Sequence, residues 1–240
     1  MSTESFNITV SGLTVEVLRK PIKNLHLGVY PPQGRIRVAA PLALNDEAVR
    51  LAVVGKLGWI KRQRAKFQAQ SRQSDRQMIS GESHYLLGRR YRLRVHQTST
   101  GLRIALRGKA TMDMFVRPET TIERRKQLLN DFYRAELKLL IPELLEKWQP
   151  RLGVEAQSWG IKRMKTKWGT CNIDARRIWL NLELAKKPVQ CLEYILVHEL
   201  AHLHERHHND RFISLLNKHL PNWQLLKDQL NSSHLADESW

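Results

Sequence analysis

The chain has 240 residues, of which 42% are hydrophobic and 26% charged, and its 40 Lys and Arg against 23 Asp and Glu give a formal net charge of +17. This composition supports a hydrophobic core in one large or two small domains and excludes wholesale disorder. The longest apolar runs are too short to span a bilayer, and the N-terminus lacks a signal-peptide pattern, so we expect no membrane contact and a cytoplasmic location. Two cysteines cannot form a disulfide-rich scaffold.

The first part of the chain reads as mainly β-structure. Residues 5–41 alternate apolar and polar side chains and predict three short strands. Asn45 stands at a helix N-cap position, and the helix it predicts is weakened by Gly55 and Gly58. Residues 78–116 return to strand patterns in three pieces, and Pro118 closes the region. No internal repeat is visible.

Helices dominate the second part. Residues 119–148 predict a long helix with an apolar stripe, which Pro142 should kink or divide; the stripe is Leu128, Phe132, Leu139, Leu140 and Leu144. Three candidate strands follow Pro150, and helices are expected over 189–205, 210–220 and 222–230. We therefore predict an α+β fold, with a β-rich region over 1–117 that contains one long helix and a second domain over 118–240.

The segment His198-Glu199-Leu200-Ala201-His202 is an H-E-x-x-H motif. Positions i and i+4 share one face of a helix, so both imidazoles can reach one cation. Glu199 projects beside them, where it can take a proton from a metal-activated water, as in zinc hydrolases. The alternative is a surface His-Glu-His cluster without an ion.

A catalytic zinc site normally has three protein ligands and one open position. His204 points to another face of the helix, and Glu205 lies a turn further along the same face. If the helix ends near residues 204–206, His207 or His208 can fold back toward the motif. Spacing alone leaves these alternatives open.

Several segments together resemble the YgjP-like metallopeptidase family, which is similar to the wider zincin group that includes SprT-like proteins. They are KTKWGTCN, WLNLEL, LEYILVHELAHLHERHHNDRF and LPNW, with PPQGRIRVAAP, KLGWIKRQR and GESHYLLGRRYRL in the β-rich region. The resemblance covers nearly the whole chain and implies a zincin-like catalytic domain with His208 as the third metal ligand beside His198 and His202. Phe212 stands at the family's Phe position, whereas Thr170 and Ile213 depart from the usual Ser and Trp.

These features predict a zinc-dependent hydrolase with a Zn²⁺ cofactor, Glu199 as the general base and a peptide as the first candidate substrate. The resemblance also admits a nucleotide substrate through a UTP pyrophosphatase activity, and a protease tethered to DNA as in SprT-like relatives. Tyr194, one turn before His198, either stabilises an oxyanion or simply packs. We interpret Cys171 and Cys191 as packing residues, because the chain has no C-x-x-C partner for them.

Two basic stretches leave a nucleic-acid partner open. Residues 50–95 contain only Asp75 and Glu82 as acids among many Lys and Arg, including the cluster Lys61, Arg62, Arg64 and Lys66. A second group, Lys162, Arg163, Lys165 and Lys167, runs into the Trp168 segment and should face the cleft. A solvated basic face is the alternative for both. The sequence gives no indication of the oligomeric state.

Overall fold

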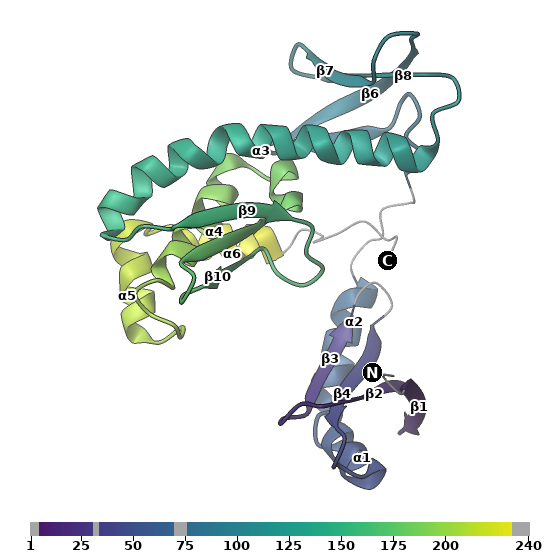
Figure 1. The fold of residues 1–240 in the computed structure, drawn as a ribbon, viewed down its shortest axis with the longest axis vertical. Coiled ribbons are helices and arrows are strands. Elements are labelled where there is room, and N and C mark those ends of the chain that lie inside the picture. The colour runs from purple at the N-terminus through teal and green to yellow at the C-terminus, as the bar shows by residue number, and fades with distance from the viewer. Residues whose placement is uncertain (1–4, 31–33, 70–75, 232–240) are drawn as a thin grey trace. The chain divides into compact units, whose positions relative to one another are not determined.

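The computed structural model describes residues 5–30, 34–69 and 76–231, with the side chains of 66–69 and 231 also left undescribed. The chain divides into two compact units, one within residues 1–74 and one within 75–239. Each unit has its own hydrophobic core. The α+β fold class is confirmed (Figure 1). The second β-rich segment belongs to the same unit as the helices that follow residue 117, and the division near residue 117 stays a prediction.

The first unit is a four-stranded sheet with two helices. Its strands are β1 (Ser5–Val10), β2 (Leu13–Lys20), β3 (His26–Tyr30) and β4 (Arg35–Pro41), in the order β1-β2-β4-β3 with β2 and β4 parallel. Four strands form instead of the three expected, because Ser11 and Gly12 both adopt positive φ and make a tight hairpin turn. Asn45 caps α1 (Asp46–Val54) by accepting from the amide of Ala48, and α2 (Leu57–Ala69) begins after Gly55.

The second unit opens with a sheet of the same topology. Its strands are β5 (Ser83–Leu86), β6 (Arg89–Gln97), β7 (Arg103–Arg107) and β8 (Thr111–Val116), in the order β5-β6-β8-β7 with β6 and β8 parallel. Leu87 and Gly88 form its hairpin turn, again with two positive φ values. The sequence showed no repeat because the two sheets share only the alternation of buried and exposed positions and the turn geometry.

The hairpin turn of the second sheet is bound to the segment 185–188 of its unit. The amide of Leu87 donates to the carbonyl of Ala185, and a Cβ on Gly88 would lie 2.8 Å from Pro188. The equivalent Gly12 of the first sheet has nothing within 4 Å of its Cβ position. A side chain at Gly88 would therefore push the sheet away from the segment that leads into the motif helix.

A single long helix, α3 (Ile122–Leu152), links this sheet with the rest of the second unit. Pro142 lies inside it without dividing it, contrary to one of the two expected outcomes. The buried stripe is also displaced by one position from the predicted one, and Leu139 is 69% exposed. The residues that form the stripe repeat every three or four positions: Leu129, Tyr133, Leu137, Ile141, Leu145, Trp148 and Leu152.

A three-stranded sheet and three helices complete the second unit. The strands β9 (Ser158–Lys162), β10 (Gly169–Asn172) and β11 (Arg177–Asn181) are ordered β10-β11-β9, so β10 is an edge strand. After the short 3-10 helix η1 (Leu182–Lys186) come α4 (Val189–Ala201), α5 (Asp210–His219) and α6 (Trp223–Asn231). These elements match the expected ones to within a few residues. Among the described helices, none has the length and apolar character that crossing a bilayer demands.

Candidate metal centre

The H-E-x-x-H motif lies at the C-terminal end of a buried helix. Pro188 precedes the first turn of α4, and the buried residues that follow fix the helix in the core: Cys191, Leu192, Tyr194, Ile195, Leu196 and Val197. The helix ends at Ala201, and His202 is its C-cap. The chain can therefore turn immediately after the motif and bring later residues back toward it.

The structure brings three histidines together at this point. One imidazole nitrogen from each of His198, His202 and His208 lies within 4.8 Å of the others, and the Nε2 atoms of His198 and His208 are 3.0 Å apart. Two ring nitrogens face each other at that distance only if a proton or a cation lies between them. This is the one group of at least three metal-ligating side chains within the described residues.

The other candidate ligands lie elsewhere. His204 bonds through Nε2 to the carbonyl of Leu152, 2.6 Å away, at the end of α3. Glu205 accepts from the amide of His207 through its side chain, and its backbone carbonyl is 3.0 Å from Nδ1 of His202. That contact leaves Nε2 of His202 as the nitrogen that faces the other two rings.

Phe212 packs against all three imidazoles. Its ring centroid lies 4.9 Å from that of His198, 4.7 Å from that of His202 and 4.8 Å from that of His208. The side chain is buried in the first turn of α5, where Asn209 caps the helix by accepting from the amide of Phe212. The capped helix thus holds one aromatic ring beneath the whole cluster.

Glu199 is buried beside the histidines and fits only because residue 169 has no side chain. A Cβ on Gly169 would lie 2.5 Å from Oε1 of Glu199. Gly169 opens the edge strand β10, so the carboxylate lies between α4 and β10. The sequence did not reveal this role of Gly169, because the close approach joins segments thirty residues apart and leaves no local pattern.

Burial sets the protonation of both groups. It lowers the pKa of His198 to about 3, with smaller contributions from His202 and His208, so this imidazole is neutral and free to bind a cation. Burial also raises the pKa of Glu199 to about 8, and the nearby Lys167 opposes that shift. His202 has a lowered pKa for the same reason as His198.

The cluster opens into a cleft of about 1000 Å³ between β10 and α4. Thr170 and Cys171 of β10 line one side, and Trp179 of β11 also contributes. Basic side chains at the cleft are Lys167, Arg206 and Lys227. Tyr194 lines the cleft and packs against His198 and Trp223, and burial raises its pKa to about 12.

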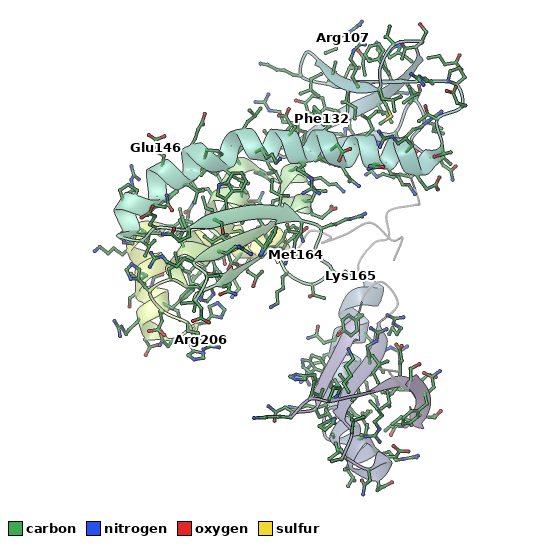
Figure 2. All side chains as sticks on the ribbon, viewed as in Figure 1. Arg107, Phe132, Glu146, Met164, Lys165 and Arg206 are labelled. Carbon is green, nitrogen blue, oxygen red and sulfur yellow. The ribbon has the colours of Figure 1, made fainter. Side chains whose placement is uncertain are left out.

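Of the four basic residues expected to face the cleft, only Lys167 lines it. Arg163 is 3.5 Å from Glu183, and Lys162 lies over the Trp179 ring. Lys165 lies on the loop before β10, away from the cleft lining (Figure 2). Residues 163–168 form a loop with bends between β9 and β10, so neither the period of a strand nor closeness in sequence to Trp168 decides which side chain reaches the cleft.

Asn181 is a site-building residue whose role the sequence did not reveal. Its side-chain amide donates to the carbonyls of Met164 and Lys167, and its Oδ1 accepts from the amides of Met164 and Glu183. The side chain is fully buried, so these bonds fix the loop that leads to Gly169. Asn181 lies in the segment WLNLEL, which resembles the family, but that resemblance implied no role for it.

The two cysteines take no part in the histidine cluster. Cys191 is buried, with its thiol 3.6 Å from Gln229. Cys171 lines the cleft, and burial together with the Glu199 charge raises its pKa to about 11. A protonated thiol is a poor metal ligand, which agrees with the packing interpretation.

Comparisons with known proteins point to one family. The model of the YgjP-like metallopeptidase domain matches residues 23–233. A search of curated proteins finds no significant match. Among solved structures, the metallopeptidase zymogen abylysin of Pyrococcus abyssi aligns with 22% identity and a TM-score of 0.38, over 41% of this chain and 99% of that one. The metallopeptidase zymogen jannalysin of Methanocaldococcus jannaschii aligns with 21% identity and a TM-score of 0.34, over 38% and 92%.

Proposed function

The chain belongs to the YgjP-like metallopeptidase family, and we propose that it is a zinc-dependent peptidase with His198, His202 and His208 as metal ligands and Glu199 as general base. The observation that carries this proposal is the convergence of three imidazole nitrogens at the end of α4. The buried carboxylate beside them supplies the base that hydrolysis requires.

The residues present fit a zinc ion. Three imidazoles with one position left open form a common donor set of catalytic zinc sites. The contact between Nδ1 of His202 and the carbonyl of Glu205 fixes the tautomer that offers Nε2 to the ion. Phe212 limits the rotation of all three rings, so the donors are held close to the arrangement that binding needs.

Bound zinc would polarise the scissile carbonyl and make water a stronger acid at neutral pH. A bound cation would favour the ionised form of Glu199 against the effect of burial on its pKa, and the carboxylate would then accept the proton of the attacking water and pass it to the leaving amine. Its buried position keeps the carboxylate in one place, because Gly169 and the motif helix enclose it. Tyr194 borders the same cleft, where its hydroxyl is a candidate donor to the developing oxyanion.

The free edge of β10 supports a peptide as the substrate. Within the described part of the chain only β11 pairs with β10, and all four residues of β10 line the cleft. An extended peptide can add to such an edge through main-chain hydrogen bonds and place its scissile bond over the histidine cluster. Main-chain pairing favours an unfolded or extended segment over a folded protein.

Matched histidine variants test the metal site. We expect His208→Ala to lose most bound zinc in metal analysis of the purified protein, while His207→Ala, its exposed neighbour, retains it. Full retention in His208→Ala would contradict the ligand assignment. Hydrolysis of an unstructured protein such as casein by the zinc-loaded enzyme tests the activity.

The three basic side chains at the cleft keep a nucleoside triphosphate as the second candidate substrate. A pyrophosphatase would release pyrophosphate from UTP with the same ion and the same base. We expect the zinc-loaded protein to cleave casein and to leave UTP intact. UTP hydrolysis that depends on Glu199, without casein cleavage, would replace the peptidase proposal.

A further inference from the structure

The second sheet has one face packed in the core and one face in solvent. Its inner side chains join the core of the unit that also contains α3, and the opposite face carries the arginines of β6 and β7. We name this outer face the arginine face. It consists of Tyr85, Arg90, Arg92, Arg94, His96, Arg103, Arg107, Thr111, Asp113 and Phe115, which share one side of the pleat by register.

The charge on this face is strongly one-sided. Asp113 is its sole acid, and it is buried beneath His96, 2.8 Å away, and Arg107, 3.1 Å away. Within the described residues, no carboxylate pairs with Arg90, Arg92 or Arg94, and all three are exposed. Neighbours on one face of a strand are about 6.6 Å apart, so these guanidinium groups form a row along β6.

Flat side chains lie next to that row. The His96 ring stacks on Phe115 at 5.0 Å, and the guanidinium of Arg103 lies 4.0 Å from the centre of the same ring. The stack joins the three adjacent strands β6, β8 and β7. At the other edge of the sheet, Tyr85 is 40% exposed. The face therefore offers planar groups as well as positive charge.

The first sheet has the same strand topology as the second but, within its described residues, does not carry a face of unpaired arginines. There the equivalent outer side places Arg37 on Glu16 through two bonds of 3.0 and 3.1 Å, with Arg35 3.8 Å from the same carboxylate. Its arginines are thus engaged with an acid of their own sheet. In the second sheet no carboxylate of a described residue pairs with the row on β6, and Arg107 remains 71% exposed despite its partner (Figure 2).

From these features we propose that the arginine face binds single-stranded nucleic acid. A row of guanidinium groups suits consecutive phosphates, and planar side chains on an open four-stranded sheet suit unstacked bases. An acidic protein or an anionic membrane would interact with the positive charge of this face, but its binding would not depend on the planar side chains. A duplex keeps its bases stacked inside and could contact only the charge.

The test uses the full-length protein and a fluorescein-labelled 20-nucleotide oligo-dT at 150 mM NaCl. We expect Arg90→Gln/Arg92→Gln/Arg94→Gln to weaken binding at least tenfold and to make the slope of log affinity against log salt shallower by about 2, since each phosphate contact on a single strand contributes about 0.7. The charge-matched control is Arg124→Gln/Lys138→Gln/Lys218→Gln, which alters exposed positions on the helices α3 and α5 of the same unit. Equal losses in the two triple variants, or no binding by the unaltered protein, would overturn the proposal.

Further probes identify the kind of ligand. We expect a 20-base-pair duplex to bind the unaltered protein more weakly than oligo-dT does. We also expect poly-glutamate and vesicles with 30% phosphatidylserine to bind weakly, and equally so, to the unaltered protein and to both triple variants. Tighter binding of any of these three that is lost in the β6 variant would assign the face to that ligand instead and overturn the proposal.

A conservative change tests the planar groups. Arg103→Lys keeps the charge and removes the flat guanidinium, so we expect about tenfold weaker oligo-dT binding with an unchanged salt slope. Unchanged affinity would show that stacking contributes nothing and would leave a purely electrostatic surface, against the proposal. Glu199→Gln and removal of metal should leave binding intact, so failure here is separable from failure of the peptidase proposal.

Discussion

The cleft at the end of α4 draws its histidines from residues 198–208, whereas the arginine face collects side chains from four strands spread over 83–116. The first region packs around Phe212 and includes the buried Glu199, whereas the arginines of β6 in the second region are exposed. A group that performs chemistry must be fixed in place, and a surface that meets a polymer must stay accessible. Changes in the cleft should therefore cost far more than changes on the outer faces.

The largest effect should come from the base. Glu199→Gln keeps the shape of the side chain and removes its ability to accept a proton, so we expect hydrolysis to fall by about 10²–10⁴ while zinc content is unchanged. Peptide turnover and metal analysis on the same preparation measure both quantities. Activity within about tenfold of the unaltered protein would mean that another group is the base.

Gly169→Ala should have the next largest effect. The new methyl group would lie 2.5 Å from Oε1 of Glu199, so the carboxylate must move. A displacement of about 1 Å at a reacting group can cost about a hundredfold in rate, and we expect that loss in kcat. Gly101→Ala is the matched control, because a Cβ there meets nothing within 4 Å. Equal activity of the two variants would contradict the close approach.

Phe212→Leu tests whether packing holds the metal ligands. The smaller side chain leaves the histidine rings freer to rotate, and we expect about tenfold weaker zinc binding, a loss typical of altered support around a metal site. Phe132→Leu makes the same change on α3, away from the cluster. Competition with a chelator measures the affinity. If both variants bind zinc equally well, the ring beneath the histidines has no positioning role.

The smallest effect belongs to the outer face of the first sheet. The Arg37 guanidinium holds the pKa of Glu16 below its usual range, so the pair stabilises the folded state above the unfolded-state pKa of about 4.3 and loses that effect as pH falls through the lower folded-state value. Glu16→Gln should lower the free energy of unfolding by less than about 1 kcal/mol at pH 7, since the pair is partly exposed.

Denaturant titrations of Glu16→Gln and the unaltered protein at pH 7 and pH 3 measure this difference. We expect it to shrink at the lower pH, where Glu16 becomes protonated. A difference that stays constant between the two values would show that the carboxylate charge is not what stabilises this face.

Local patterns in the sequence predicted most of the helices and strands. Alternation identified the strands, Asn45 and Pro188 marked helix starts, and the i, i+4 spacing placed His198 and His202 on one side of α4. The two-residue turn at 11–12 hid one strand of the first sheet, because it lacks the usual Asn-Gly signal. The stripe of α3 was misplaced because Leu residues flank both sides of the buried line.

Contacts between segments far apart in the chain could not be predicted from the sequence. His208 was one of several candidates until the resemblance selected it, and the fold of the loop after His202 brings it to the cluster. The fit of Gly169 against Glu199, the bonds of Asn181 and the gathering of arginines on one sheet face each depend on register between segments far apart in the chain. None of these leaves a periodic signal.

The hairpin turn at Leu87 and Gly88 affects how a substrate would reach the cleft. Its bond to Ala185 and the continuous helix α3 tie the second sheet to the catalytic part at two points, so both belong to one body. The arginine face would then lie at a fixed distance from the cleft, and a protein carried on the nucleic acid bound there would be held near the cleft. Its effective concentration there would reach about the millimolar range, and a low intrinsic affinity of the cleft for peptide would suffice.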